Sequence, residues 1–128
     1  MKIQVEKVQV LRDERGWIYE PLGPDALAGQ RNVHVALTLP GAVRGNHRHQ
    51  RGTEILTVPG PALVRVREED GLRDYEVPSG EVHRFTIPPG VAHAVKNTGS
   101  EPGIMVGFNN QRHDRAQPDS VRDVLIEE

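Results

Sequence analysis

Two histidines and a carboxylate lie close together in the stretch from Gly41 to Glu54. His47 and His49 are two positions apart, and alternate side chains of an extended strand point to the same face of a sheet. Both imidazoles are therefore expected on one side, and Glu54 follows after a short break that contains Gly52. Imidazole and carboxylate groups together suit zinc, iron, manganese or nickel. The stretch predicts three ligands of one divalent metal ion.

A fourth ligand is expected from His93, which follows the turn Pro88-Pro89-Gly90. Four protein ligands leave coordination positions open for water or substrate, which is typical of a catalytic metal site. The alternative is a set of polar residues at the mouth of a barrel that bond to one another and to water. We favour the metal, and the donor types leave zinc, iron, manganese and nickel open.

Other side chains have the chemistry to act on a substrate beside this site. His34 lies on the polar side of an expected strand, where it faces either a cavity or solvent. Tyr75 is one of two tyrosines, and a phenol can donate a proton, although tyrosines on strands more often pack. Lys96 comes shortly after His93 and is a candidate for binding the substrate. We name His34 and Tyr75 as the candidate catalytic residues.

Short strands are expected to hold these residues. Pro24 and Gly29 bracket the one exception, a short helical turn at residues 24–29. Short strands at regular spacing, separated by turns such as Asp70-Gly71, favour an all-β sandwich or barrel. The tail at 117–125 is compatible with a strand or a helical turn. The expected strands cover residues 5–11, 17–20, 33–39, 55–58, 62–67, 72–77, 82–87, 91–96 and 104–108.

One expected strand shows a strict alternation of apolar and polar residues. Val33, Val35 and Leu37 alternate with His34 and Ala36. Such a pattern predicts a half-buried strand with its apolar residues facing a core.

Composition limits the possible partners. The chain has 128 residues, which fits a single domain at 1–128. Sixteen lysines and arginines against eighteen acidic residues give a formal charge of −2, and without a basic run no nucleic-acid partner is expected. The absence of cysteine excludes disulfides and thiolate sites. Residues 1–7 lack the apolar run of a secretory signal, and no stretch could span a membrane, so a cytoplasmic location is expected.

Two motifs in the chain resemble those of the cupin family. The stretch from Gly41 through the two histidines and Glu54 to Gly60 resembles the family's first motif, with a closing gap one residue shorter than usual. Residues Pro88 to Asn97, which contain His93, resemble the second motif from its Pro-x-Gly onward. The resemblance implies a small antiparallel β-barrel, or jelly roll, that holds a metal through the four residues named above.

A narrower resemblance covers most of the chain. Three segments, Asp13-Glu14-Arg15-Gly16, Arg44-Gly45-Asn46-His47 and Gln117-Pro118-Asp119-Ser120, are similar to those of cupin-type enzymes that remodel nucleotide-linked 4-keto sugars. The pattern most resembles the carboxy-terminal cupin domain of bifunctional capsular-polysaccharide enzymes. That family implies a zinc-dependent epimerase in polysaccharide biosynthesis, with a reductase that would here be a separate partner. It also implies a homodimer, in which the amino-terminal strands could exchange between subunits and cover an exposed edge.

A different role for the first histidine follows from related enzymes. In metal-free dehydrorhamnose epimerases and related ketoisomerases, a histidine in a similar Arg-Gly-x-His setting acts as the base. By that resemblance His47 would remove a proton and Arg44 would hold a phosphate of the substrate. A nitrogen bonded to a metal cannot also accept a proton, and Glu54 and His93 together favour the metal. A metal-dependent dioxygenase and a non-catalytic small-molecule-binding cupin remain further alternatives.

Overall fold

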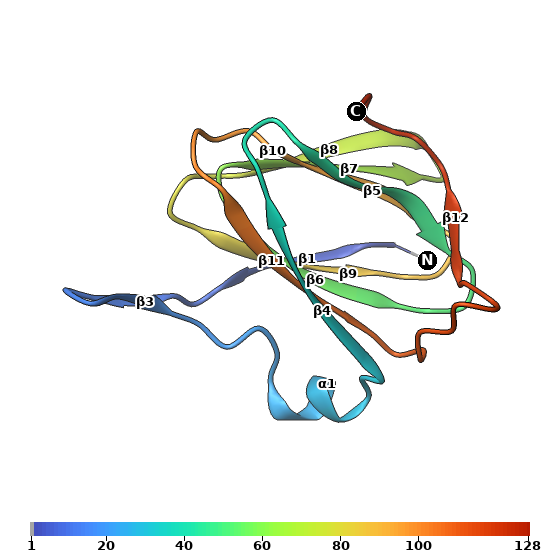
Figure 1. Cartoon of the computed structure of the whole chain (residues 1–128), viewed down its shortest axis with the longest axis horizontal. Coiled ribbons are helices and arrows are strands. Elements are labelled where there is room, and N and C mark those ends of the chain that lie inside the picture. The colour runs from blue at the N-terminus through green and yellow to red at the C-terminus, as the bar shows by residue number, and fades with distance from the viewer. Residues whose placement is uncertain (1) are drawn as a thin grey trace.

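The computed structural model describes residues 2–128 as two five-stranded antiparallel sheets that face each other (Figure 1). The first sheet has the order β1 (Gln4–Val8), β9 (Val82–Ile87), β6 (Glu54–Pro59), β11 (Gly103–Asn109) and β4 (Asn32–Thr38). The second has the order β12 (Ser120–Arg122), β5 (Val43–His49), β10 (Ala92–Asn97), β7 (Ala62–Glu68) and β8 (Gly71–Val77). The remaining elements are β2 (Leu11–Asp13), β3 (Gly16–Ile18) and the helix α1 (Pro24–Ala28).

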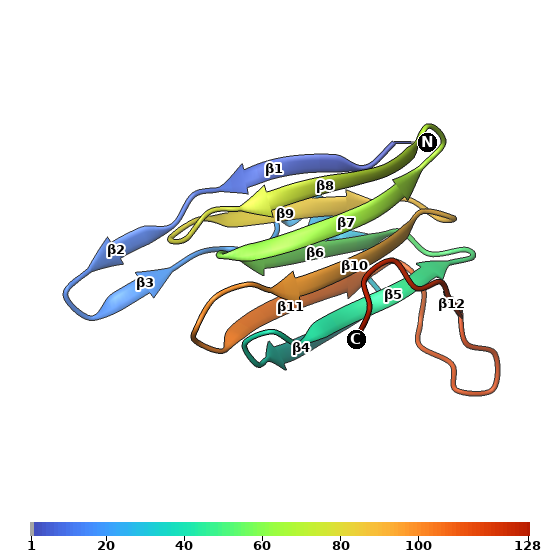
Figure 2. The ribbon, with the colours of Figure 1, turned by 90° about the horizontal axis from the view of Figure 1, so that it is seen from above.

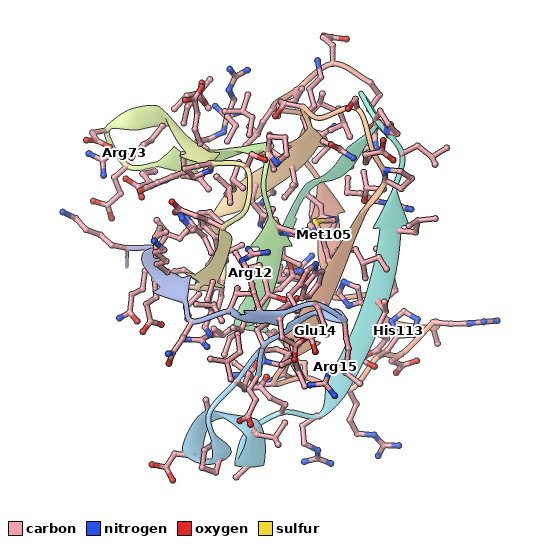
Figure 3. The ribbon with its side chains drawn as sticks, turned by 90° about the vertical axis from the view of Figure 1, so that its left-hand side faces the viewer. Arg12, Glu14, Arg15, Arg73, Met105 and His113 are labelled. Carbon is pink, nitrogen blue, oxygen red and sulfur yellow. The ribbon has the colours of Figure 1, made fainter. Side chains whose placement is uncertain are left out.

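This architecture confirms the all-β prediction, including the single short helical segment. The expected strand at 5–11 is wrong in its extent, because it is divided between β1 and β2. Strands β2 and β3 form a separate hairpin that projects from the sandwich (Figure 2). Figure 3 looks at this hairpin from its own side, with Arg12, Glu14 and Arg15 on it. In the tail, β12 pairs with β5, which settles the open choice in favour of a strand.

Apolar residues of both sheets meet in one core between the sheets. Strand β6 is buried from Glu54 to Val58, because it lies in the middle of the first sheet. Phe85 of β9 and Val64 of β7, one from each sheet, are fully buried in this core. The core fills only part of the interior, and the polar site described below occupies the rest. Within residues 2–128, no helix has the length and apolar character needed to cross a membrane.

The faces of β4 are the reverse of those predicted. Val33, Val35 and Leu37 are 58%, 68% and 52% exposed, whereas His34, although exposed itself, and the half-buried Ala36 line a cavity between the sheets. The alternation correctly predicted a strand, but the interior at this position is a polar cavity rather than apolar core. Strand β4 also forms an edge of the first sheet. Its outer face is therefore an exposed apolar strip.

A β-bulge lies next to the first histidine of β5. His93 of β10 pairs with His47, and the following Ala94 pairs with Gly45, so Asn46 is the extra residue in the pairing. Gly45 and Asn46 have φ values of 85° and 58°, which lie in the left-handed region. A Cβ atom at Gly45 would lie 2.8 Å from the carbonyl oxygen of His93. Only glycine allows this close approach of the two strands that carry the histidines.

Asn46 also fastens the carboxy-terminal segment to β5. Its buried side-chain amide donates to the carbonyl oxygen of Ile126 at 2.9 Å and to Glu128 Oε2 at 3.1 Å. Its side-chain oxygen accepts from the backbone N–H groups of Leu125 and Ile126 at 2.9 and 3.1 Å. The segment at residues 123–128 is thus held directly at the residue that precedes His47.

Candidate active site

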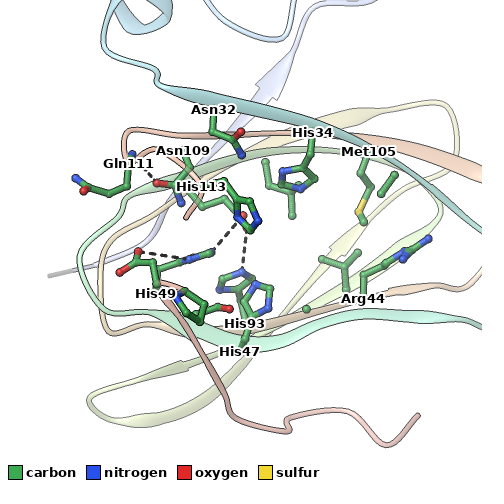
Figure 4. A pocket seen from close by; sticks show the side chains of 18 of the residues that line it. Asn32, His34, Arg44, His47, His49, His93, Met105, Asn109, Gln111 and His113 are labelled. Carbon is green, nitrogen blue, oxygen red and sulfur yellow. Dashed lines mark hydrogen bonds and ion pairs between the residues drawn. The ribbon is translucent and has the colours of Figure 1, made fainter. Parts of the chain in front are cut away.

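Four side chains from both sheets converge inside the sandwich. His47 and His49 come from β5 and His93 from β10, whereas Glu54 begins β6 of the opposite sheet. One candidate ligand atom of each residue lies within 4.8 Å of the others. The rings of His47 and His93 meet edge to face, with 4.8 Å between their centroids (Figure 4). The four residues named from the two sequence motifs are brought together in one cluster.

Glu54 places a negative charge in the middle of this cluster. Its Oε1 lies 3.0 Å from Nε2 of His93, and its Oε2 lies 3.3 Å from Nε2 of His49. Burial alone would raise the pKa of Glu54, but its contacts with the two histidines hold that pKa well below its usual range. The buried carboxylate is therefore ionised.

The histidines differ in their protonation. Burial, together with the nearby His93, lowers the pKa of His47 to about 4. Burial also acts to lower the pKa of His49, but the carboxylates of Glu54 and Asp119 outweigh it and raise that pKa. Near neutral pH, His47 is consequently a neutral imidazole with a free nitrogen lone pair.

The donor set fits a divalent metal ion. Nδ1 of His93 lies 3.2 Å from the carbonyl oxygen of Val91, and Nε2 lies 3.0 Å from Oε1 of Glu54; both oxygens can only accept, and the neutral ring has one N–H to donate. When Nδ1 carries that hydrogen, the lone pair of Nε2 is free to bind a cation. Both ring nitrogens of His49 are buried and make no hydrogen bond within residues 2–128. A cation bound by one nitrogen of each histidine and by Glu54 would give these atoms a partner, so the cluster could hold a metal.

The cluster opens into a cavity of about 410 Å³ between the two sheets. Its apolar wall is formed by Leu56, Val95 and Met105, which also belong to the core. The remaining lining residues are polar or small, and they come from β4, β5, β11, the segment after β11 and the first residue of β12. They are Asn32, His34, Ala36, Arg44, Gly45, Asn109, Gln111, Arg112, His113, Asp114, Pro118, Asp119 and Ser120.

Two of the other predicted residues lie on this cavity. His34 projects from β4 across its partner strand, since a Cβ atom at Gly107 would lie 2.4 Å from the His34 ring. Arg44 reaches from β5 to β4, where it donates to the carbonyl oxygen of Leu37 at 2.6 Å and to Thr38 Oγ1 at 3.4 Å. Both side chains are labelled in Figure 4, with Met105 beside them.

Tyr75 and Lys96 are not among the residues that line the cavity. The Tyr75 hydroxyl donates to Glu68 at 3.4 Å, and its ring packs edge to face on Phe85. Lys96 is three residues beyond His93 on β10, so it lies on the opposite face of that strand. The geometry therefore gives neither residue a contact with a substrate in this cavity.

Sequence reasoning assigned no role to Asp119, whose carboxylate lies beside the ring of His49. Its Oδ2 lies 3.7 Å from Nδ1 of His49, and its carboxylate accepts the backbone N–H groups of Arg51 and Gly52 at 2.8 Å each. The motif at residues 117–120 was the available signal, but it did not indicate the pairing with His49. His113 is exposed and lies at the rim of the cavity.

An antiparallel sandwich that surrounds a cluster of three histidines and one glutamate is the architecture of a cupin-type protein. The chain matches the family described as "Polysaccharide biosynthesis C-terminal domain" over residues 11–121, and it belongs to that family. It is also similar to the probable low-salt glycan biosynthesis epimerase Agl13 of Haloferax volcanii. The two are 26% identical over 133 residues, which cover 94% of this chain and 85% of the relative.

Solved structures show the same fold. The capsular polysaccharide assembling protein CapF of Staphylococcus aureus is 26% identical with a TM-score of 0.68, and the match covers 92% of this chain. The chain spans only 33% of CapF. The sugar 3,4-ketoisomerase QdtA of Thermoanaerobacterium thermosaccharolyticum is 18% identical with a TM-score of 0.72, over 94% of this chain and 88% of QdtA. The 3′-monoepimerase ChmJ of Streptomyces bikiniensis is 14% identical with a TM-score of 0.74, over 94% of this chain and 68% of ChmJ.

These comparisons confirm the predicted resemblance to cupin-type enzymes of capsular-polysaccharide and sugar-nucleotide metabolism. Several of these proteins are named as epimerases or isomerases.

Proposed function

We propose that this protein is an epimerase or isomerase of a nucleotide-linked 4-keto sugar in the biosynthesis of a polysaccharide or other glycan. The observation that carries the proposal is the buried Glu54 between His49 and His93, at the wall of a cavity large enough for a sugar ring. We propose that these residues and His47 hold a divalent metal, with zinc as the first candidate. The relatives' epimerase and ketoisomerase names support the reaction class.

The reaction requires loss of a proton from the carbon next to the ketone, which leaves negative charge on a sugar oxygen. A bound metal would supply Lewis-acid stabilisation of that charge. Among the chain's own residues, His34 is the proposed proton carrier, because it lines the cavity without belonging to the four-residue cluster. Arg44 is the proposed contact for polar groups of the substrate. Leu56, Val95 and Met105 keep water from one side of the cavity.

The test is exchange of the sugar's carbon-bound hydrogen with solvent deuterium, followed by NMR. Protein purified without chelators or nickel affinity resin is assayed with nucleotide-linked 4-keto sugars, and its metal content is measured. We expect exchange to stop after chelation and to return when zinc is added. Equal exchange by the chelated and metal-loaded forms would refute the metal's role. Binding of the sugar nucleotide without exchange in either form would instead indicate a non-catalytic binding module.

The second candidate is a metal-free isomerase in which His47 is the base. The observation in its favour is that His47 lines the cavity and, with its pKa lowered to about 4, is neutral and able to accept a proton. A pKa so far below neutral makes it a weak base, which favours the metal proposal. The Glu54→Gln variant separates the two. It should be inactive if a metal is required and active if His47 alone removes the proton.

We further propose a homodimer that works in the cytoplasm beside a separate reductase. The projecting hairpin supports the dimer, because Leu11, Trp17 and Ile18 on it are 60%, 56% and 65% exposed. The lack of cysteine is consistent with a reducing compartment. The proposal of a separate reductase rests on the resemblance to bifunctional capsular-polysaccharide enzymes. Its test is whether the epimerised product accepts hydride only when such a reductase and a nicotinamide cofactor are added.

A further inference from the structure

A second hollow opens directly beside the active-site cavity. It has a volume of about 670 Å³ and shares with that cavity the four residues from Gln111 to Asp114. Three arginines line it, namely Arg31, Arg51 and Arg112. They come from three different segments: the connection from α1 to β4, the loop between β5 and β6, and the segment after β11. A group bound in this hollow would be next to a substrate in the cavity.

The hollow carries an excess of positive charge. Among the acidic residues, only Asp114 lines it, and its Oδ1 already accepts the backbone N–H of Ala116 at 2.9 Å. Arg51 lies 3.5 Å from Asp119, which offsets one of the three charges. Within residues 2–128, no ion pair of Arg31 or Arg112 with a carboxylate is found. Two guanidinium groups are therefore available to an anion.

The backbone that carries these arginines is held in place. The backbone N–H of Arg31 donates to the carbonyl oxygen of Asn109 at 2.9 Å, and that of Arg51 donates to Asp119 Oδ1 at 2.8 Å. These contacts tie the rim of the hollow to the end of β11 and to the carboxylate behind His49. The backbone at Arg31 and Arg51 is thus fixed relative to the cluster.

We infer that the hollow binds the diphosphate of the substrate, with the attached sugar extending into the cavity toward the histidines. This inference rests on the proposed function. Guanidinium groups match phosphate oxygens with two parallel N–H donors, which is the usual reason for arginine at such sites. Arg44 is the alternative phosphate ligand, but its guanidinium already donates to Leu37 and Thr38. Arg44 and Gln111 also lie on opposite sides of the cavity (Figure 4).

The direct test is titration calorimetry with inorganic pyrophosphate, followed by uridine and thymidine diphosphates. We expect Arg31→Gln and Arg112→Gln each to weaken pyrophosphate binding about five- to tenfold, because each removes a charged hydrogen-bond donor at a partly exposed site. Binding should also weaken as ionic strength rises. Arg115→Gln is the matched control, since Arg115 belongs to the same segment but does not line the hollow. It should bind pyrophosphate as tightly as the unaltered protein.

Pyrophosphate also binds divalent metals, so each titration is done with metal-loaded and with chelator-treated protein. An arginine effect that persists in both forms supports the inference. An effect that disappears after chelation would place the anion on the metal and overturn it. Unchanged binding by the folded double variant Arg31→Gln/Arg112→Gln, with its fold checked by circular dichroism, would overturn it as well.

These titrations measure binding without turnover, so their outcome does not depend on whether the proposed reaction occurs. If the arginine effect holds but no 4-keto sugar undergoes exchange, the hollow is a diphosphate site and the proposed reaction is wrong. If exchange occurs, the arginine variants should raise KM while leaving kcat within about twofold, because the contact is made equally in the ground and transition states.

Discussion

Glu54 and His47 show how burial acts in opposite ways on neighbouring groups. Glu54 keeps its charge in the interior because imidazole nitrogens face both of its oxygens. His47 loses the tendency to be charged, because burial and His93 both disfavour its protonated form. The result is an anionic carboxylate and a neutral imidazole side by side. Both are in the state that a metal ligand must have.

The lowered pKa of His47 predicts a pH dependence of stability. The folded chain protonates this residue at about 4, whereas the unfolded chain protonates it near 6.5. Between these values the unfolded state binds more protons, so the free energy of unfolding should fall as the pH is lowered through this window. Urea unfolding of chelator-treated protein should show a smaller loss for His47→Asn than for the unaltered protein.

His49 titrates in the opposite sense, because its folded pKa is raised. Its contribution is present at low pH and is lost as the pH rises through the folded value. Both proteins in the comparison contain His49, so its effect cancels to first order. Parallel curves for the unaltered protein and His47→Asn would show that the pKa of His47 is not lowered.

The place of His34 over Gly107 predicts a substitution that separates catalysis from metal binding. A Cβ atom at Gly107 would lie 2.4 and 2.6 Å from Cε1 and Nε2 of the His34 ring, so Gly107→Ala must displace the ring. We expect hydrogen exchange of the substrate to fall at least about tenfold, as expected when a proton carrier is misplaced. Metal affinity should change little, because the three heavy atoms nearest the added Cβ all belong to His34 and none belongs to a proposed ligand.

The matched control is Gly103→Ala on the same strand, where the added Cβ atom would have 3.6 Å to its nearest neighbour. If Gly103→Ala and Gly107→Ala have the same activity, His34 is not the proton carrier.

At the scale of elements, the bulge in β5 depends on Asn46. This residue combines a positive φ with four side-chain hydrogen bonds to residues 125–128. Asn46→Ala should lower the free energy of unfolding by about 3 kcal/mol, since it leaves buried backbone groups unpaired and places alanine in the left-handed region. Asn46→Gly removes the same side chain but relaxes the backbone, so it should cost about 1 kcal/mol less. Urea unfolding of the three proteins measures both differences.

A spectroscopic readout shows whether the bulge positions the histidines as well as stabilising the fold. Cobalt can replace zinc, and its visible absorption reports the geometry of the ligands. We expect Asn46→Gly to alter the cobalt spectrum. An unchanged spectrum in a less stable protein would mean that Asn46 holds the tail without shaping the site.

Sequence reasoning was most successful where the signal was local. The two-residue spacing of His47 and His49 and the Pro-Gly turn before His93 correctly predicted which residues meet. The same period of two places Lys96, three positions from His93, on the opposite face of β10. The pairing of Asp119 with His49 could not be predicted, because the two residues are 70 positions apart and come into contact only in the folded sandwich.

The faces of β4 were mispredicted for a different physical reason. Alternation shows that the two sides of a strand differ, but it does not show which side faces the interior. In this fold the interior beside β4 is the active-site cavity, so the polar residues point inward and Val33, Val35 and Leu37 point outward. The position of Tyr75 against Phe85 likewise depends on how far the core extends between the sheets.

At the scale of the whole molecule, the exposed strip of β4 and the projecting hairpin predict self-association. Exposed apolar surface of this kind on an edge strand favours contact with another chain. We expect light scattering after gel filtration to give twice the 14.2 kDa chain mass. Val35→Glu and Trp17→Glu should each weaken the dimer if both surfaces are buried in it.

Leu72→Glu is the control for these variants, because Leu72 on β8 is similarly exposed, at 56%. A 14.2 kDa monomer at working concentrations would contradict the homodimer. Loss of the dimer in only one of the two variants would show which surface forms the contact.

The hydrogen bonds between Asn46 and the segment at residues 125–128 have a thermodynamic consequence at long range. Any ligand that fixes β5 at His47 must also favour the docked segment, and docking must favour the ligand by the same factor. The backbone amides of Leu125 and Ile126 should therefore exchange with solvent more slowly when the cluster is loaded. A fluorophore or an affinity tag joined after Glu128 would disturb docking of this segment and would therefore change the affinity for the ligand. The outside of the second sheet thus offers a way to sense, or to disturb, the occupancy of a site enclosed within the sandwich.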